Sequence, residues 1–402
     1  MIRKPAIPAW FAIVVVAALP ISPVWGQTQG PMSLGFKKRF VVEVRNPSPL
    51  LLENHPVVLN VEEIRAFAPD FNTSNYALFD ETGGGYRLVV SQADDFNKDR
   101  THEEIIFVRT LPPSSTTRLA CYYSPKGSFQ LMMTTPKAGA HLLKGRPGEA
   151  LAAWESNLAA FKFIDGRVES LAKLYPGLIL TKNLADDAKL QEWGQDILPG
   201  SGPPGLGGLS VGTGGALVPL TAAGAGGDFF VQRSIVAAGP IRALVKVEFT
   251  AKTAGAAGDG TVVFFSAVAD NVFSRQDIFP AAKTAGRAVY GIGVQRLGGE
   301  DVSLDKGHGF LSVWGRGTGD VGEIGLAVLF SPVEFAGLDE TAAGRTIRLN
   351  AKPGKRLTVW TVGGWARGIV TAAAPAATNW ARFTADLASR LGVPLEVRFR
   401  AN

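Results

Sequence analysis

Short runs of β-branched, aromatic and aliphatic residues recur along the chain, and glycine, proline, asparagine or aspartate separates most of them. Runs such as residues 40–44, 105–108, 241–249 and 357–362 have the length and composition of strands. Few stretches of helical periodicity lie between these runs, which argues against the alternating strands and helices of a parallel sheet. The sequence therefore predicts a mainly all-β fold built from antiparallel sheets.

The runs fall into two groups, and each group predicts a β domain. Residues 27–125 hold five runs spaced by turn-prone loops, which predicts a small N-terminal β-sandwich-like module. Residues 126–149 contain several prolines and glycines and are predicted to form a linker. Residues 150–402 hold the longer series of runs and are predicted to form a large antiparallel β-sandwich domain.

One helix is predicted near the end of the chain. Four apolar residues recur there at helical spacing: Trp380, Phe383, Leu387 and Leu391. Thr378 or Asn379 can cap the start of this helix, and Gly392 and Pro394 follow its end. The pattern indicates an amphipathic C-terminal helix over residues 379–391 that packs on the sandwich.

The start of the chain has the features of a signal peptide. Arg3 and Lys4 precede an unbroken apolar run over residues 10–19, and small residues precede Gln27. The run is well short of the roughly 20 residues that span a bilayer as a helix. We therefore expect a cleaved signal peptide at residues 1–26, export to the periplasm or the exterior, and no membrane partner after cleavage.

The composition argues against several classes of function. A single cysteine, Cys121, rules out an intrachain disulfide framework, and its place in a strand-like run predicts an inert buried thiol. The net charge is +6, but no dense cluster of lysine and arginine with interleaved aromatic residues occurs, so nucleic acid is not an expected partner. No phosphate-binding or dinucleotide-binding glycine motif opens a helix, so no cofactor is predicted.

The run G-L-S-V-G at residues 208–212 matches the nucleophile-elbow pattern of serine hydrolases. That chemistry requires a sharp turn from a strand into a helix, and then an acid and a histidine. Glycines follow Ser210 instead of a helical segment, and chance matches are frequent in a glycine-rich stretch. The residues around Ser210 therefore favour a loop over a serine esterase.

Asp95, Asn97 and Asp99 place oxygen ligands at alternate positions, as a calcium-binding loop does. Arg100 occupies the sharp-turn position where an EF-hand needs glycine, and Ile106 stands where its bidentate glutamate would be. None of the four histidines pairs with another histidine or a cysteine at metal-ligand spacing. We therefore predict a solvated acidic turn and no metal site, with calcium at this turn as the alternative.

Tryptophans beside ionisable residues are the pattern that points most directly to a ligand. Indole stacks on the apolar C–H face of a sugar, while carboxylate and guanidinium groups bond to its polar edge. Three tryptophans have such a neighbour in sequence: Trp154 with Glu155, Trp193 with Asp196, and Trp314 with Arg316. For each pair alone, a tryptophan in the core beside a charge on the surface is the favoured alternative.

Several segments taken together resemble one family. They follow one another along the chain at residues 44–48, 56–58, 91–95, 103–107, 153–156, 193–196, 205–208, 239–242 and 363–365, with Trp380 in the last helix. In this order the chain resembles the bacterial domain-of-unknown-function family 4861, whose members are exported and often encoded among polysaccharide-degrading genes. The resemblance implies a β-sandwich of the kind seen in galactose-mutarotase-like proteins, but no established activity. Asn157 departs from the family pattern, in which an aspartate commonly follows Trp-Glu-Ser.

The leading prediction is an exported carbohydrate-active enzyme, a polysaccharide lyase or a glycoside hydrolase, whose glycan could contain uronic acids. Hydrolysis needs two carboxyl groups, which Glu155 and Asp196 could supply. β-Elimination needs a cation beside the uronate and a base, which Arg316 and either His308 or Tyr290 could supply. The alternative is a non-catalytic glycan-binding protein of the periplasm. The sequence does not indicate an oligomeric state.

The predicted cleft lies in the larger domain and joins Trp154 and Glu155 to Trp193 and Asp196. Three further side chains are predicted to contact the glycan: Tyr290, Trp314 and Arg316. Burial beside indole disfavours the charged form of a carboxyl group, which suits a general acid. If these carboxyl groups are catalytic, Glu155→Gln and Asp196→Asn should leave thermal stability nearly unchanged and abolish turnover or glycan binding.

Overall fold

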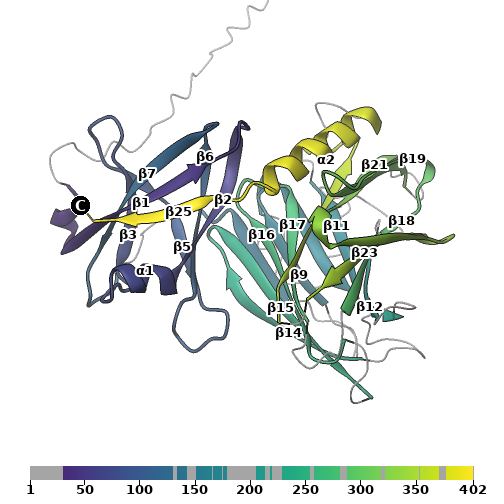
Figure 1. Cartoon of the computed structure of the whole chain (residues 1–402), viewed down its shortest axis with the longest axis horizontal. Helices are drawn as coiled ribbons and strands as arrows, with labels where there is room; N and C mark the ends of the chain where they lie inside the picture. Colours follow the sequence, from purple (N-terminus) through teal and green to yellow (C-terminus); the bar gives the residue numbers. More distant parts are fainter. Residues whose placement is uncertain are drawn as a thin grey trace, which may run out of the picture.

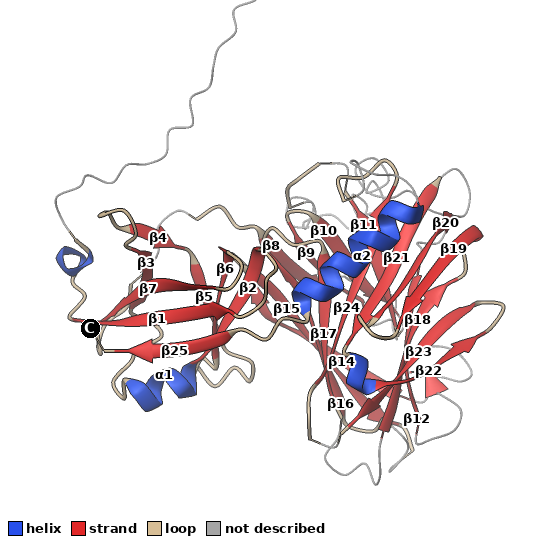
Figure 2. Ribbon diagram, turned by 45° about the horizontal axis from the view of Figure 1, so that its top comes forward, coloured by secondary structure: helices blue, strands red, loops and turns tan. Residues whose placement is uncertain are grey.

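The computed structural model describes residues 30–129, 134–142, 151–164, 166–173, 175–178, 205–212, 218–219, 229–253, 258–280, 288–317, 322–352, 354–370 and 377–401. Two β-structured units lie side by side, a smaller N-terminal module and a larger sandwich (Figure 1). Strands make up most of both units, and every pairing between described strands is antiparallel (Figure 2). The predicted mainly all-β fold is therefore confirmed. The predicted signal peptide lies outside the described residues and stays a prediction.

The N-terminal module contains a five-stranded and a three-stranded sheet. The five-stranded sheet has the order β25 (Glu396–Arg400), β1 (Lys38–Asn46), β7 (Ser115–Tyr123), β3 (Tyr76–Asp80) and β4 (Arg87–Val89). The three-stranded sheet has the order β2 (Leu52–Asn60), β6 (Glu104–Leu111) and β5 (Ser91–Asp94). The 3₁₀ turn η1 (Pro31–Leu34) precedes β1, and helix α1 (Val61–Phe67) follows β2.

The two sheets of this module pack face to face because their strands alternate inward and outward residues. In β1, for example, the inward side chains of Phe40, Val42 and Val44 are at most 2% exposed. Helix α1 begins at Asn60, whose side-chain oxygen accepts two backbone N–H bonds from the first turn. Ile64 of this helix packs into the same core.

The last strand of the chain belongs to the N-terminal module. β25 pairs with β1 in an antiparallel register along its full length. Val397 and Phe399 pack against the core of the module, where the Phe399 ring lies 5.9 Å from that of Phe40. The chain therefore returns to its first module at its end, which differs from the predicted assignment of residues 150–402 to one domain.

The large unit is a sandwich of two sheets. The nine-stranded sheet has the order β22 (Phe335–Glu340), β23 (Gly344–Ala351), β18 (Ala288–Gln295), β12 (Gly205–Gly212), β11 (Arg167–Ala172), β10 (Ala159–Ile164), β9 (Leu151–Ser156) and β8 (Ala138–Leu142), and β13 (Val218–Pro219) pairs with β12. The eight-stranded sheet has the order β14 (Phe229–Ala238), β15 (Arg242–Ala251), β16 (Thr261–Val268), β17 (Phe273–Phe279), β24 (Leu357–Trp365), β21 (Glu323–Phe330), β20 (Phe310–Arg316) and β19 (Gly298–Asp305). The 3₁₀ turn η4 (Pro332–Glu334) precedes β22. Because β8 lies in the sandwich, the stretch predicted as a linker already contains one of its strands.

The largest core lies between these two sheets. Trp154, Phe161, Phe163 and Phe265 are fully buried in it. The Trp154 ring stacks on Phe265 with centroids 4.9 Å apart, and on Phe161 with centroids 6.1 Å apart. Burying each such side chain contributes roughly 1.5–3 kcal/mol, so these inward strand positions hold the two sheets together.

Helix α2 (Ala377–Leu391) confirms the predicted C-terminal helix and covers part of the outer face of the eight-stranded sheet (Figure 2). Trp380 is 1% exposed and packs with Trp314, their ring centroids 6.0 Å apart. A Cβ atom at Gly325 of β21 would overlap the Trp380 ring, so only glycine lets the helix approach this strand so closely. The two described α-helices have seven and fifteen residues, and neither has the length and hydropathy of a membrane span.

A joint connects the two units where the outer face of the three-stranded sheet meets the ends of β15 and β16. Its apolar part includes Ile106 of β6 and Ile241 next to β15. Its polar part is the buried guanidinium of Arg242, whose Nε donates to Asp94 at 2.7 Å and whose Nη2 donates to Glu104 at 2.9 Å. A buried arginine paired with two carboxylates of the other unit fixes the relative position of the two units.

Gln92 of β5 completes the joint. Its Oε1 accepts the backbone N–H groups of Ile241 and Arg242 at 2.8 and 3.0 Å. Its Nε2 donates to the Arg242 carbonyl at 2.9 Å and to the Asp94 carboxylate at 2.6 Å. One buried side chain of the module therefore satisfies backbone groups of Ile241 and Arg242 at the start of β15, across the joint.

Candidate functional site

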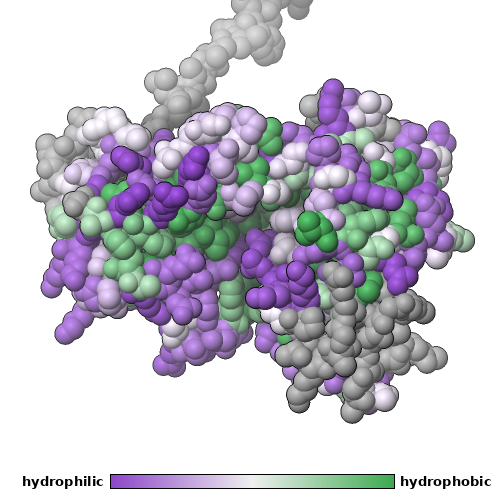
Figure 3. Space-filling view, viewed as in Figure 1, coloured by the Kyte–Doolittle hydropathy of each residue, from purple (hydrophilic) through white to green (hydrophobic). Residues whose placement is uncertain are grey.

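A cleft of about 550 Å³ opens at the joint and has walls from both units. Arg87 of β4 and Arg109 of β6 line it from the N-terminal module, and Asn54 of β2 lies between the units. Lys137, which precedes β8, and Asp270, in the turn between β16 and β17, line it from the sandwich. Figure 3 shows, on one face of the molecule, the furrow between the two units, bordered by both hydrophilic and hydrophobic side chains. Charged and polar groups in a cleft fix the orientation of a ligand.

A second hollow of about 490 Å³ adjoins the first and shares Thr134 and Pro240 with it. Tyr76 and Ser91 line its module side, and the Tyr76 hydroxyl lies 3.1 Å from the Ser91 hydroxyl. Burial raises the pKa of Tyr76 well above its ordinary value, so the phenol stays protonated. The hollow therefore combines a few hydroxyl groups with apolar residues such as Phe129 and Pro136.

The module wall of the cleft depends on Asp80, the last residue of β3. Its carboxylate forms ion pairs with Arg109 and, at 3.3 Å, with Arg87. Burial alone would raise the pKa of Asp80, but hydrogen bonds from Thr82 and the charge of Arg109 outweigh it and lower this pKa to about 2. Asp80 is therefore ionised at neutral pH and fixes the guanidinium of Arg109 at the cleft.

The sandwich wall depends on Asp270 and Asn157. The Lys137 ammonium donates to both oxygens of Asp270 at 3.0 and 2.8 Å, and the Asn157 amide donates to Oδ1 at 2.9 Å. The Asn157 side-chain oxygen accepts the backbone N–H of Asp270 at 2.8 Å. Asp270 has a left-handed backbone conformation with φ of 59°, which this pair of bonds holds in place.

Ser156 and Asn271 connect this wall to the core and to the module. The Ser156 hydroxyl donates to the Asn271 carbonyl at 2.6 Å, and the Asn271 amide donates to the carbonyl of Asn54 at 3.0 Å. Residues 156 and 157, at the end of β9, therefore hold both the turn that carries Asp270 and a contact across the joint.

The predicted pair Trp154 and Glu155 lies inside the sandwich, where both residues are fully buried. The Trp154 indole nitrogen donates to the Ser274 hydroxyl at 3.0 Å. Glu155 accepts a hydrogen bond of 2.6 Å from Lys173, and burial lowers the pKa of Lys173 although the Glu155 charge opposes this shift. Neither side chain can contact a ligand in this structure, because neither has exposed surface.

Tyr290 and Trp314 are also buried. The Tyr290 hydroxyl lies 2.9 Å from the Thr261 hydroxyl in the core between the sheets, and burial raises the pKa of this phenol. Trp314 is 4% exposed beneath α2. These two predicted glycan contacts therefore lie in two different cores.

His308 and Arg316 are exposed but lie at opposite ends of β20. A strand rises about 3.4 Å per residue, so the backbone at the two ends of β20 is about 20 Å apart, which separates the two side chains. The His308 ring nitrogen Nδ1 lies 2.7 Å from Asp305, and this contact holds the pKa of Asp305 below its ordinary value. The predicted pairing of an arginine with this histidine is therefore not present.

Trp193 and Asp196 lie outside the described residues, so their part of the predicted site stays a prediction. The structure describes the backbone of Ser210, which lies in β12, with strand β18 on one side and β13 on the other. It continues as a strand to Gly212 and does not enter a helix there. The backbone therefore lacks, at this position, the strand-to-helix turn of a nucleophile elbow.

The acidic turn brings Asp95, Asp99 and Glu103 together, with ligand oxygens within 4.8 Å of one another. Backbone N–H groups of the same loop already occupy these oxygens, as in the 2.7 Å bond from Thr101 to Asp99 and the 2.8 Å bond from Phe96 to Glu103. The hydrogen bond from Thr101 lowers the pKa of Asp99. The turn is thus ordered by hydrogen bonds from its own backbone.

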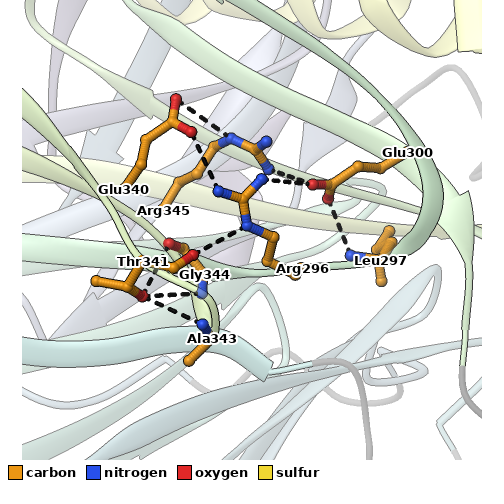
Figure 4. A network of polar contacts seen from close by, with 8 residues as sticks. All are labelled: Arg296, Leu297, Glu300, Glu340, Thr341, Ala343, Gly344 and Arg345. Carbon is orange, nitrogen blue, oxygen red and sulfur yellow. Dashed lines mark hydrogen bonds and ion pairs between the residues drawn. The ribbon is translucent and has the colours of Figure 1, made fainter.

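A second charged cluster joins β19 to β23 at one end of the sandwich (Figure 4). Arg345, whose side chain is 8% exposed, donates to Glu300 at 2.8 Å, and Arg296 donates to the same carboxylate at 3.0 Å. Glu340 lies 3.2 Å from Arg296. Burial would raise the pKa of Glu300, but a backbone N–H bond from Leu297 and the two arginines lower it. The two arginines and two glutamates are bonded to one another, so the cluster has no net charge. It connects residues of β19 and β23 at this end of the sandwich.

The comparison of sequences identifies the family. The family described as domain of unknown function 4861 (DUF4861) matches residues 44–134 and 152–397. The chain belongs to this family. The matched residues extend over both units of this chain. The resemblance seen in the sequence is thereby confirmed, and no curated protein sequence matches the chain.

The chain is similar to two solved structures. One is an α-mannosidase from Enterococcus faecalis V583, at 9% identity and a TM-score of 0.43, over 91% of this chain and 46% of that chain. The other is a protein of glycosyl hydrolase family 38 from Enterococcus faecalis, at 9% identity and a TM-score of 0.43, over 91% of this chain and 48% of that chain. This DUF4861 protein spans about half the length of either chain.

Sequence reasoning did not identify the residues that line the cleft. Arg87, Arg109, Lys137 and Asp270 are single charged residues in different strands and turns, without a motif around them. The available signal was indirect, because three of the family-like segments contain the joint residues Gln92, Asp94, Glu104, Ile241 and Arg242. Segments that meet at one joint could have pointed to the cleft beside it.

Proposed function

We propose that this DUF4861 protein is an exported carbohydrate-binding protein and that the cleft at the joint binds an acidic saccharide. The observation that carries the proposal is the convergence of Arg87, Arg109 and Lys137, from two units, on one open cleft. Guanidinium and ammonium groups bind the carboxylate of a uronate, and Asn54 and Asp270 can bond to its hydroxyl groups. A cleft of about 550 Å³ has room for a short oligosaccharide segment.

The arrangement favours binding over turnover. The carboxylate that lines the cleft, Asp270, already accepts bonds from Lys137 and Asn157, and the buried Asp80 behind the module wall pairs with Arg109. A general acid must have a proton to deliver at the leaving oxygen, and the pKa of Asp80 is lowered to about 2 by Thr82 and Arg109. We therefore infer that the module and the sandwich together hold a glycan.

The second candidate is an enzyme on the same glycan, a polysaccharide lyase or a glycoside hydrolase. One observation favours the lyase: Arg109 and Lys137 could neutralise a uronate carboxylate, which β-elimination requires. Elimination produces an unsaturated sugar that absorbs ultraviolet light, and hydrolysis produces reducing ends without that absorbance. Both products are measured directly on the same glycan panel.

The test is a panel of acidic and neutral polysaccharides with binding and product readouts. The double variant Arg87→Gln/Lys137→Gln changes two well-exposed cations, with side chains 73% and 51% exposed, so the fold should be kept. We expect the wild type to bind acidic glycans, with an affinity that falls with salt, and the variant to bind about tenfold more weakly or worse. Arg382→Gln on α2, exposed and bonded to Asn379, is the matched control. Equal binding by wild type and double variant would place the site elsewhere.

A further inference from the structure

The outer face of the eight-stranded sheet carries a second group of aromatic and charged side chains, away from the cleft. We call it the Arg275 face, and it consists of Phe264 of β16, Arg275, Asp277 and Phe279 of β17, and Thr358 and Trp360 of β24. Along β17 the alternate residues Ser274, Gln276 and Ile278 are buried between the sheets, so Arg275, Asp277 and Phe279 point outward together.

The strand register places aromatic and polar side chains in alternate positions on this face. Asp277 lies opposite Phe264 on one side and Thr358 on the other, and Arg275 lies opposite Trp360. The rings of Phe264 and Phe279 meet edge to face with centroids 5.6 Å apart. Directly opposed and diagonal residues on one face of a sheet are within side-chain reach, so the six residues form one continuous surface.

Asp277 is the polar centre of the face. Its Oδ1 accepts hydrogen bonds from the Thr358 hydroxyl at 2.7 Å and from Arg275 Nε at 3.1 Å, and Arg356 Nε lies 3.6 Å from it. A guanidinium has five N–H donors, and the single bond to Asp277 uses one of the donors of Arg275. Two guanidinium groups beside one carboxylate also give this part of the surface a net positive charge.

The face is open to solvent and bordered on two sides. Phe279 is 38% exposed, and the side chains of Arg356 and Arg275 are 46% and 25% exposed. On one border Phe96 of the acidic turn packs on Phe264, with ring centroids 5.6 Å apart. On the other border Trp360 packs against the cluster beneath α2. A ligand can therefore reach an exposed ring and free guanidinium donors between two fixed borders.

The geometry points to the Arg275 face as a second saccharide-binding surface, specific for an acidic oligosaccharide; the ligand class rests on the proposed function. A sugar ring stacks on Phe279, while its hydroxyl groups bond to Asp277 and Thr358. Its carboxylate meets the guanidinium groups of Arg275 and Arg356, which bind carboxylates through paired N–H donors. Rings alternate here with hydrogen-bonding groups over one face of the sheet, and this matches the alternating apolar faces and polar edges of a saccharide chain.

Isothermal titration with an oligogalacturonide tests the proposal, with maltopentaose as the neutral comparison. We expect two binding sites per wild-type chain and one site in the double variant Arg275→Gln/Phe279→Ala. Asp277 keeps Thr358 and Arg356 as partners in that variant, so the fold should be retained, and the thermal midpoint checks this. Phe230→Ala is the matched control, because Phe230 is a 61% exposed phenylalanine of the same sheet. Arg356→Gln is a milder change and should lower the affinity of the second site by about threefold to tenfold. It replaces the double variant in the test if the double variant unfolds.

The outcomes separate this proposal from the cleft. Loss of one site in Arg275→Gln/Phe279→Ala, with the other lost in Arg87→Gln/Lys137→Gln, supports both. An unchanged number of sites and unchanged affinity in the first variant and in Arg356→Gln overturns the Arg275 face and leaves the cleft standing. A wild type that is dimeric by light scattering and monomeric as Phe279→Ala identifies the face as an interface between copies, which also overturns the proposal. Absence of any binding to the oligogalacturonide overturns both sites.

Discussion

Replacing Lys173 by methionine should destabilise the sandwich strongly. Lys173 and Glu155 are both fully buried, and the Lys173 ammonium donates to the Glu155 carboxylate at 2.6 Å. The same ammonium donates to the carbonyl oxygens of Ser156 and Gly177, each at 2.6 Å. These three bonds use every N–H donor of the ammonium. Lys173→Met keeps an unbranched side chain of similar length and removes the charge and all three donors at once.

The expected loss in the free energy of unfolding follows from the buried groups that remain without a partner in the variant. Removing one partner of a buried ion pair costs about 3–5 kcal/mol, because the other charge remains in a medium that solvates it poorly. The buried carbonyl of Ser156 also loses a donor, which costs roughly 1 kcal/mol and is partly included in that range. The double variant Glu155→Met/Lys173→Met has no buried charge, so it should regain all but about 1–2 kcal/mol of the wild-type free energy of unfolding.

Tryptophan fluorescence during urea unfolding measures this effect in the sandwich alone. From residue 27 onward, every tryptophan lies at position 154 or later, so the signal reports on the sandwich and α2. Lys246→Met is the matched control, because Lys246 forms a partly exposed pair with Glu248 at 2.9 Å and should cost less than about 1 kcal/mol. A cost below about 1 kcal/mol for Lys173→Met would refute the reasoning. So would a double variant no more stable than the single one.

Three further changes test other parts of the fold. Burial lowers the pKa of His55 to about 4, whereas the unfolded state binds the proton near the ordinary pKa of about 6.5. The contribution of neutral His55 to the free energy of unfolding should therefore be complete above pH 6.5 and fall by about 2–3 kcal/mol toward pH 4. His55→Gln should flatten this pH profile in urea titrations. Glu300→Gln should cost about 2 kcal/mol in thermal unfolding, because it weakens the bonds that Glu300 accepts from the nearly buried Arg345 and from Arg296, and an unchanged midpoint would contradict this. Gly325→Ala should cost about 1–3 kcal/mol and shift the tryptophan emission, because the new methyl group overlaps Trp380; unchanged emission would show that α2 packs differently.

The strands and the last helix could be predicted because their signals are local. The run at residues 241–249 becomes β15 at Arg242–Ala251, and the helical spacing at residues 379–391 becomes α2 at Ala377–Leu391. In both elements the side chains that alternate or recur in sequence are the ones that the fold buries. A periodic pattern indicates which face of an element is buried, and its period is sufficient to predict whether the element is a strand or a helix.

The residues of a strand do not indicate which other strand it pairs with. β25 follows the helix of the large unit, yet its pairing partner is β1, more than three hundred residues earlier in the chain. β8 lies in a stretch punctuated by proline and glycine, which had favoured a linker. Pairing over such separations depends on how the complete sheets close, and local composition does not record it.

The same limit applied to the candidate site. A tryptophan followed by a glutamate is compatible with a sugar site or with a core, and the difference depends on a lysine eighteen residues away. Once Lys173 pairs with Glu155, the predicted mutation Glu155→Gln should reduce stability, not spare it. The lining of the cleft is still less local, since its cations come from β4, β6 and the approach to β8, and two units must meet before they face one ligand.

The end of β9 shows how scaffold and site are connected in this protein. Trp154 packs in the core, Glu155 anchors Lys173, Ser156 bonds to Asn271, and Asn157 holds Asp270 at the cleft. An asparagine can donate to the Asp270 carboxylate and accept its backbone N–H at the same time. An aspartate at position 157 could only accept when ionised, and it would place a second carboxylate against Asp270. The amide thus leaves the cleft one negative charge fewer, which is what a site for an acidic saccharide requires.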